Sequence, residues 1–125
     1  MQTEKETIKA DDTISTLIEE ILTPYTFIKL SKKRKGHVIE IVCLMIPLLN
    51  STRPVKLDPL YRIISEKTGI DSYKSIKTSL TCAYETFLAT KNFHDMYEGE
   101  WRDKDDHPKQ KEFFMYIAAL VKERL

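Results

Sequence analysis

The chain has 125 residues, of which 42% are hydrophobic and 31% charged, and its formal net charge is +1. This length suits one domain with a single core, and the composition is too apolar for a disordered chain. Because the net charge is close to zero, the chain as a whole is not drawn to nucleic acid or to a membrane. Binding to either would need a local cluster of charge.

Membrane insertion and secretion find no support in the sequence. The longest strongly apolar stretch, 38–49, is interrupted by Glu40 and is shorter than the roughly 20 residues of a membrane span. The polar start of the chain lacks the apolar segment of a secretory signal. We therefore expect a cytoplasmic location, no membrane partner, a flexible segment over 1–11 and one domain over 12–125.

Catalytic and metal-binding motifs are likewise missing. The sequence contains no nucleophile elbow, zinc-binding pair or phosphate-cradling glycine loop, so we predict no enzyme, no cofactor and no metal. His94, Asp95 and Glu98 could share one helical face, but this is a weak metal signal in an acidic surface segment. Cys43 and Cys82 fall in helical patterns and are expected to be reduced and largely buried.

The chain has only three glycines and five prolines and few alternating β-branched runs, so it is predicted to be all-α. The first helix should begin at Asp12 or Thr13, with an apolar stripe over 14–22, and end at Pro24. A second helix should run from about Ser31 into Leu49, although Pro47 would kink it or end it early.

The predicted start of the second helix is unusually basic. Its first turn holds Lys32, Lys33, Arg34 and Lys35. Each cation at a helix N-terminus opposes the macrodipole by typically ~0.3–1 kcal/mol. Either the helix starts later, as part of a solvated basic turn, or an anionic group is expected beside it.

Two helices joined by a tight turn are predicted in the middle of the chain. Asp58-Pro59 is a start signal and Gly69 a stop signal, with Leu60, Ile63 and Ile64 expected in the core and Tyr61, Arg62, Ser65 and Glu66 nearer solvent. The next helix should open at Asp71 or Ser72. A short helix, a turn and a longer helix match the helix-turn-helix pattern. A final helix should follow Pro108, with Phe113, Ile117, Leu120 and Val121 in the core.

The charge of this middle region favours nucleic-acid binding. Between residues 53 and 78 six cations face three acids, a local net charge of +3. In a helix-turn-helix the start of the second helix enters the major groove and flanking cations hold phosphates. The predicted base-reading residues are Ser72, Tyr73, Lys74, Ser75, Lys77, Thr78 and Thr81. The predicted phosphate contacts are Lys32, Lys33, Arg34, Lys35, Arg53, Lys56, Arg62 and Lys67.

Three stretches resemble the DNA-binding effector domain of the sporulation master response regulator of endospore-forming bacteria. They are ISTLIEEILTP, LYRIISEKTGIDSYKSIKTSLTCAYETF and HPKQKEFFMYIAALVKERL, which resemble the family's opening helix, helix-turn-helix and closing helix in order and spacing. The resemblance implies a compact bundle of about six helices, of the winged-helix-like effector class, and promoter binding as a head-to-tail dimer. The family's recognition-helix arginines fall here on Ser75, Thr78 and Thr81.

Two functions are consistent with these observations. The first is a sequence-specific, DNA-binding transcription regulator of bacterial, phage or plasmid origin that lacks a receiver domain and binds double-stranded DNA, with a homodimer suggested by the resemblance. The alternative is a protein-interaction module that keeps the fold but has lost DNA reading, and that binds a regulator or itself. The changed arginine positions and the acidic segment 95–106, with a net charge of −4, motivate this alternative.

Overall fold

The computed structural model describes residues 13–69, 71–90 and 109–125. All regular structure in these ranges is helical, which confirms the predicted all-α class. The elements are a helix over 13–22, the 3-10 helices η1 (Thr23–Tyr25) and η2 (Phe27–Lys29), α2 (Lys32–Met45), η3 (Ile46–Leu48), α3 (Leu57–Thr68), α4 (Tyr73–Leu88) and α6 (Gln110–Arg124). The segments 1–11 and 95–106 lie outside the described residues.

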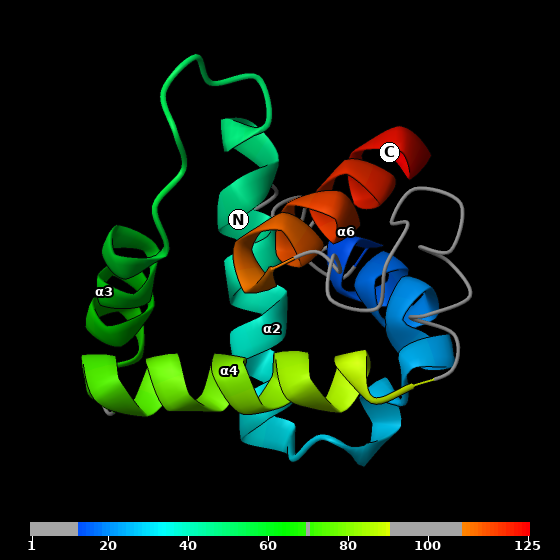
Figure 1. Cartoon of the computed structure of the whole chain (residues 1–125), viewed down its shortest axis with the longest axis horizontal. Helices are drawn as coiled ribbons and strands as arrows, with labels where there is room; N and C mark the ends of the chain where they lie inside the picture. The colour runs from blue at the N-terminus through cyan, green and yellow to red at the C-terminus, as the bar shows by residue number, and fades with distance from the viewer. Residues whose placement is uncertain (1–12, 70, 91–108) are drawn as a thin grey trace, which may run out of the picture.

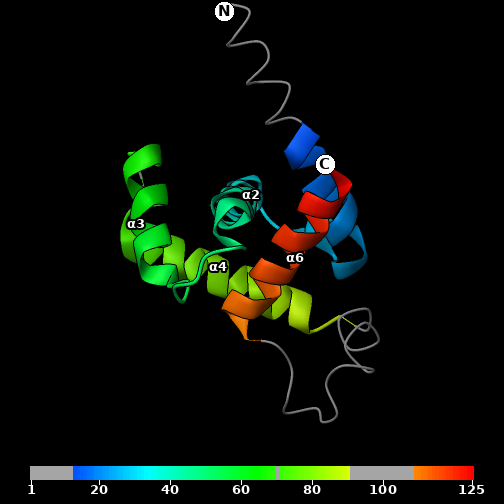
Figure 2. The ribbon, with the colours of Figure 1, turned by 90° about the horizontal axis from the view of Figure 1, so that it is seen from above.

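Helix α2 occupies the centre of the described fold and packs against α3, α4 and α6. Figure 1 shows α4 crossing α2, with α3 beside the start of α4. In Figure 2 α2 is seen nearly end-on, with α3 on one side of it and α6 on the other. Helix α2 fits this central position because its buried face is broad and is extended by the partly buried Ile39, Cys43 and Leu44. The buried residues are His37, Val38, Ile41, Val42 and Met45.

The core is closed by aromatic side chains at the start of α6. The fully buried ring of Phe113 lies with its centroid 5.8 Å from that of Tyr25, 6.0 Å from that of Tyr84 and 5.7 Å from that of Phe87. Aromatic rings at such distances attract one another beyond the effect of buried area alone. This cluster joins η1, α4 and α6, and so fixes α4 from the side opposite its exposed face.

The turn between α3 and α4 has the end signals that the sequence predicts. Gly69 takes a left-handed conformation with φ +65° and donates its N–H to the carbonyl of Ser65, which ends α3. Glycine adopts this conformation without the steric cost of a Cβ atom. Ser72 then caps α4, because its Oγ accepts a hydrogen bond from the backbone N–H of Ser75 at 3.2 Å.

The two proline signals act close to where the sequence predicts. The first helix is α-helical to Leu22 and passes into η1, which contains Pro24 and ends at Tyr25. The second helix is α-helical only to Met45, and η3, which contains Pro47, follows it because proline cannot donate the next α-helical hydrogen bond. Cys43 and Cys82 are free thiols with intermediate exposure.

The face of α3 was predicted wrongly at two positions. Tyr61, expected near solvent, is 2% exposed, whereas Ile63, expected in the core, is 43% exposed. The Tyr61 ring packs edge-on against Tyr73, with centroids 6.0 Å apart, and its hydroxyl accepts a hydrogen bond from Nε2 of Gln110. A buried tyrosine needs such a partner for its hydroxyl, and α6 supplies it. Burial raises the pKa of Tyr61 to about 12, with a further contribution from the carboxylate of Asp58.

Candidate functional site

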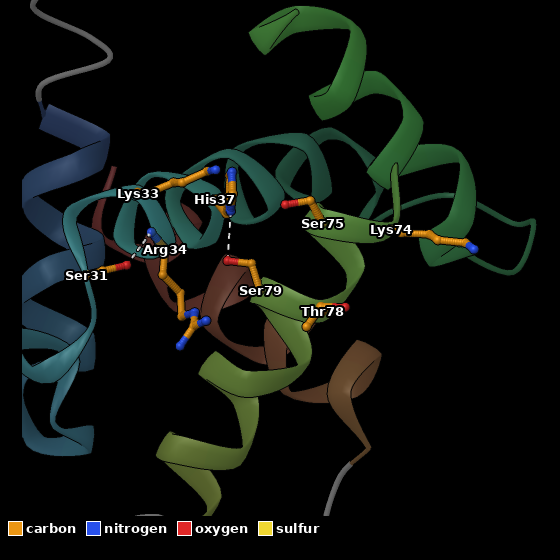
Figure 3. A pocket seen from close by; sticks show the side chains of 8 residues that line it. All are labelled: Ser31, Lys33, Arg34, His37, Lys74, Ser75, Thr78 and Ser79. Atoms are coloured by element: carbon orange, nitrogen blue, oxygen red, sulfur yellow. Dashed lines mark hydrogen bonds between the residues drawn. The ribbon is translucent and has the colours of Figure 1, made fainter. Parts of the chain in front are cut away.

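An open groove of about 360 Å³ lies between the start of α2 and the start of α4 (Figure 3). Among the described residues three cationic side chains, four hydroxyl groups and one imidazole line it, and none of these lining residues is an acid. The lining residues are Ser31, Lys33, Arg34, His37, Lys74, Ser75, Thr78 and Ser79. A surface of this composition offers hydrogen-bond donors and positive charge, which suit an anion.

The α2 wall of the groove is the basic first turn of that helix. Ser31 caps α2, because its Oγ accepts from the backbone N–H of Arg34 at 3.2 Å. The first turn contains no acid to balance the positive end of the helix dipole. The Arg34 side chain extends from α2 toward α4 (Figure 3), and its buried Nε has no hydrogen-bond partner among the residues that the structure describes.

The α4 wall of the groove consists of residues on the exposed side of that helix. Ile76 and Leu80 are fully buried and set the rotation of α4. Because of this rotation, Lys74, Ser75 and Thr78 are exposed. In Figure 3 the hydroxyl of Ser75 points toward α2, while Lys74 extends away from Arg34.

A buried histidine connects the two walls. His37 is 3% exposed, and its Nδ1 lies 2.8 Å from Oγ of Ser79 in α4, while its Nε2 lies 3.1 Å from Oδ2 of Asp71 in the turn before α4. A carboxylate can only accept, so Nε2 donates to Asp71, while Nδ1 and the Ser79 hydroxyl are hydrogen-bonded to each other. Lys33 Nζ lies 2.5 Å from the other carboxylate oxygen of Asp71. The four side chains therefore form one hydrogen-bonded network between α2 and α4.

The charge state of Asp71 follows from these contacts. Its side chain is 8% exposed, and its pKa is lowered from 3.8, first by the hydrogen bond from Lys33 and next by that from His37. Asp71 is thus a carboxylate at neutral pH. Its charge balances Lys33, so Arg34 and Lys74 are the cations that the network leaves uncompensated within the groove.

The order Ser79, His37, Asp71 also brings a nucleophile and a base within hydrogen-bond reach. A nucleophilic serine needs donors placed for a developing oxyanion, but the backbone N–H groups in the interior of a helix are already committed to helical hydrogen bonds. Ser79 lies inside α4 and is only 8% exposed. We interpret the array as a connection between helices.

The predicted base-reading residues fall into two groups. Ser72, Lys74, Ser75, Lys77 and Thr78 are exposed near the start of α4. The other two, Tyr73 and Thr81, are partly buried and bonded within the protein. The Tyr73 hydroxyl donates to Oδ1 of Asp58 at 2.6 Å, which raises its pKa, and Thr81 Oγ1 donates to Oε1 of Gln110 at 3.3 Å.

The predicted phosphate contacts are spread more widely. Lys33 and Arg34 lie in the groove, and Lys32 is exposed beside it. Four others lie elsewhere. Lys35 Nζ lies over the Phe27 ring, 5.7 Å from its centroid, and Arg62 lies over the Tyr73 ring. Arg53 and Lys56 are exposed in the segment before α3. Lys67 Nζ lies 3.0 Å from both carboxylate oxygens of Glu40. The groove thus brings together two predicted phosphate contacts, Lys33 and Arg34, and three predicted base-reading residues, Lys74, Ser75 and Thr78.

His37, Asp71, Ser79 and Ser31 were not among the predicted site residues. His37 and its two partners are 42 and 34 residues apart in sequence, so no local motif contains them. The available signal was the position of His37 beside the apolar residues of α2, where a polar side chain needs a partner. The capping role of Ser31 could have been predicted from its place before the basic run.

No protein-family model, no curated protein and no solved structure matches the chain. Within the described ranges no group of three or more His, Cys, Asp or Glu side chains could hold a metal ion. His94, Asp95 and Glu98 lie outside these ranges. None of the helices in the described part of the chain has both the length and the apolar character of a membrane span.

Proposed function

We propose that the chain binds double-stranded DNA through the start of α4 and acts as a transcription regulator. The observation that carries this proposal is the groove, in which cations of the α2 turn and polar residues of α4 share one surface and no described lining residue is an acid. Phosphate-binding groups beside a helix with an exposed polar face are what major-groove recognition requires. In this proposal α3 and α4 are the two helices of a helix-turn-helix.

The structure narrows the set of residues proposed to read bases. Lys74, Ser75, Lys77 and Thr78 are exposed on α4, and lysine can donate to guanine while serine and threonine pair with several bases. Tyr73 and Thr81 have internal partners and are assigned to positioning α4. Lys33, Arg34 and Lys32 are the proposed phosphate contacts nearest to this face.

The resemblance to the sporulation-regulator effector domain supports the same proposal. It suggests a bacterial, phage or plasmid regulator in the cytoplasm, and a head-to-tail dimer on DNA. The polar residues Ser75 and Thr78, which stand where the family has arginines, indicate a different target sequence. The stoichiometry of the purified protein on selected DNA, measured by sedimentation, tests the dimer.

The proposed function can be tested by selection from a random pool of DNA duplexes. We expect a recurring motif, and we expect Lys74→Ala and Lys77→Ala to weaken binding to it by roughly 1–3 kcal/mol each while random DNA is affected less. Lys122→Ala is the matched control, because Lys122 is exposed in the last turn of α6 and is not among the residues that line the groove. The control should bind like the unchanged protein at every salt concentration.

The protein-interaction module is the competing outcome of the same experiment. The acidic segment 95–106, which motivates this alternative, lies outside the described residues. If the protein retains no duplex even at low salt, where phosphate contacts are strongest, the DNA proposal is wrong. Recovery of a defined protein partner that Lys74→Ala fails to bind would then support the alternative.

A further inference from the structure

We infer that the groove is a binding site for one phosphate group and that Arg34 is the residue that recognises it. This inference deepens the proposed function and rests on it for the source of the phosphate, a phosphodiester of the DNA backbone. Inorganic phosphate offers the same chemistry and serves as the probe. The contacts of Arg34, the lining of the groove and the state of its other cations carry the inference in turn.

The first observation is the unpaired nitrogen of Arg34. Its Nε is buried and has no hydrogen-bond partner in the described part of the chain. Buried polar atoms in native proteins are nearly always paired, so each exception needs an explanation. The side chain lines the groove (Figure 3), so an acceptor in the groove would meet the outer nitrogens of the guanidinium group rather than the buried Nε.

The second observation is the chemistry of the surrounding groups. Ser31, Ser75 and Thr78 add hydroxyl groups to the guanidinium, and the described residues that line the groove include no carboxylate that would repel an anion. The start of α2 also contributes the positive end of the helix dipole. A tetrahedral oxyanion can accept from several of these donors at once.

The third observation distinguishes Arg34 from the other cations of the groove. Lys33 is held by Asp71, and Lys74 extends away from Arg34 (Figure 3). Arg34 therefore contributes a charge that no carboxylate of the described residues pairs with, and a planar fork of donors that fits phosphate oxygens. Lysine at this position would keep the charge but lose the fork.

The site can be tested by following the Arg34 Nε–Hε signal in nitrogen–proton NMR spectra. Inorganic phosphate is added in one titration and a short duplex in another, with chloride at equal ionic strength as the reference. We expect the Arg34 signal to shift in both titrations, while the signal of Arg124, exposed at the end of α6, stays in place. The absence of an Arg34 shift in both titrations would overturn the inference.

Variants test the same site through affinity. Arg34→Lys should weaken duplex binding about 10-fold, equivalent to the loss of one charge-assisted hydrogen bond of about 1.4 kcal/mol, with the salt slope unchanged because the charge remains. Arg124→Lys is the matched control and should not change affinity. Ser75→Ala should reduce the response to inorganic phosphate and gives a second reading that does not depend on changing Arg34.

The outcomes separate this inference from the proposed function. Tight duplex binding with an unmoved Arg34 signal and an unaffected Arg34→Lys variant would overturn the phosphate site and leave DNA binding standing. A saturable Arg34 shift with phosphate, but no duplex binding at low salt, would overturn the proposed function and support the site as one for a free phosphate group.

Discussion

The hydrogen bond between Ser79 and His37 predicts a difference between two serine variants in the same helix. Ser79 lies 2.8 Å from the buried His37 ring, whereas Ser75, one turn earlier in α4, is exposed. Ser79→Ala and Ser75→Ala remove the same hydroxyl group from helical positions. Only the first change removes the partner of a buried nitrogen.

The magnitude follows from the burial of His37, which is 3% exposed. A buried donor or acceptor left without a partner costs about 1–3 kcal/mol. Alanine favours a helix over serine by up to about 0.5 kcal/mol, and this gain is common to both variants. Ser75→Ala should therefore change the free energy of unfolding by no more than about 0.5 kcal/mol. The free energy of unfolding of Ser79→Ala should be about 1–3 kcal/mol lower than that of Ser75→Ala.

Urea denaturation followed by far-ultraviolet circular dichroism measures this difference, provided that the slope against urea is the same for both variants. A lower midpoint for Ser79→Ala alone is the expected result. Equal midpoints for the two variants would refute the reasoning, because His37 would then stabilise the fold no better with the serine than without it. An altered slope would show instead that the denatured state had changed.

Three further predictions concern charge, backbone and core. The contacts of Asp71 lower its pKa below 3.8, so the Asp71 carboxylate stabilises the fold at pH values above its unfolded pKa, and this contribution is lost as the pH falls through the folded pKa. Urea midpoints measured from neutral to acid pH should therefore fall less for Asp71→Asn than for the unchanged protein. Gly36→Ala should stabilise the protein by about 0.5–1 kcal/mol, because Gly36 lies inside α2, whereas Gly69→Ala, at φ +65°, should destabilise it by about 1–2 kcal/mol. Calorimetric melting temperatures of the two variants test this difference, since at both positions an added Cβ meets nothing within 4 Å. Phe113→Ala should destabilise by about 3–5 kcal/mol, because three rings lose their common partner, and a midpoint close to that of the unchanged protein would contradict the packing described.

The helices could be predicted because their signals are local. The cap at Ser72, the stop at Gly69 and the apolar spacing of Ile76 and Leu80 all lie within one turn of the feature they determine. The exchange of Tyr61 and Ile63 on α3 could not be predicted in this way. Both residues lie next to the apolar face, and the choice depends on Tyr73 and Gln110, which the fold brings together from two other elements.

The candidate site shows the same division between local and long-range information. The basic run 32–35 indicated an anion, and the exposed polar face of α4 indicated a reader, but the groove that joins them depends on how α2 and α4 pack. The role of His37 could not be predicted, because its partners lie 42 and 34 residues away in the sequence. A hydrogen-bond network between distant helices leaves no spacing pattern in the sequence.

The network also explains why two adjacent cations at the start of α2 should have different roles. Asp71 neutralises Lys33 and holds it against the turn before α4, so Lys33 helps to fix the distance between the two helices. Among the described residues Nε of Arg34 has no such partner, and the Arg34 side chain lines the groove in which we propose an anion binds. Replacing Lys33 should therefore loosen the position of α4 and affect stability and binding together, whereas Arg34→Lys should affect binding alone. A ligand that is held by Arg34 and contacts α4 would meet both groups in a fixed register, because His37 and Asp71 already connect the helices that carry them.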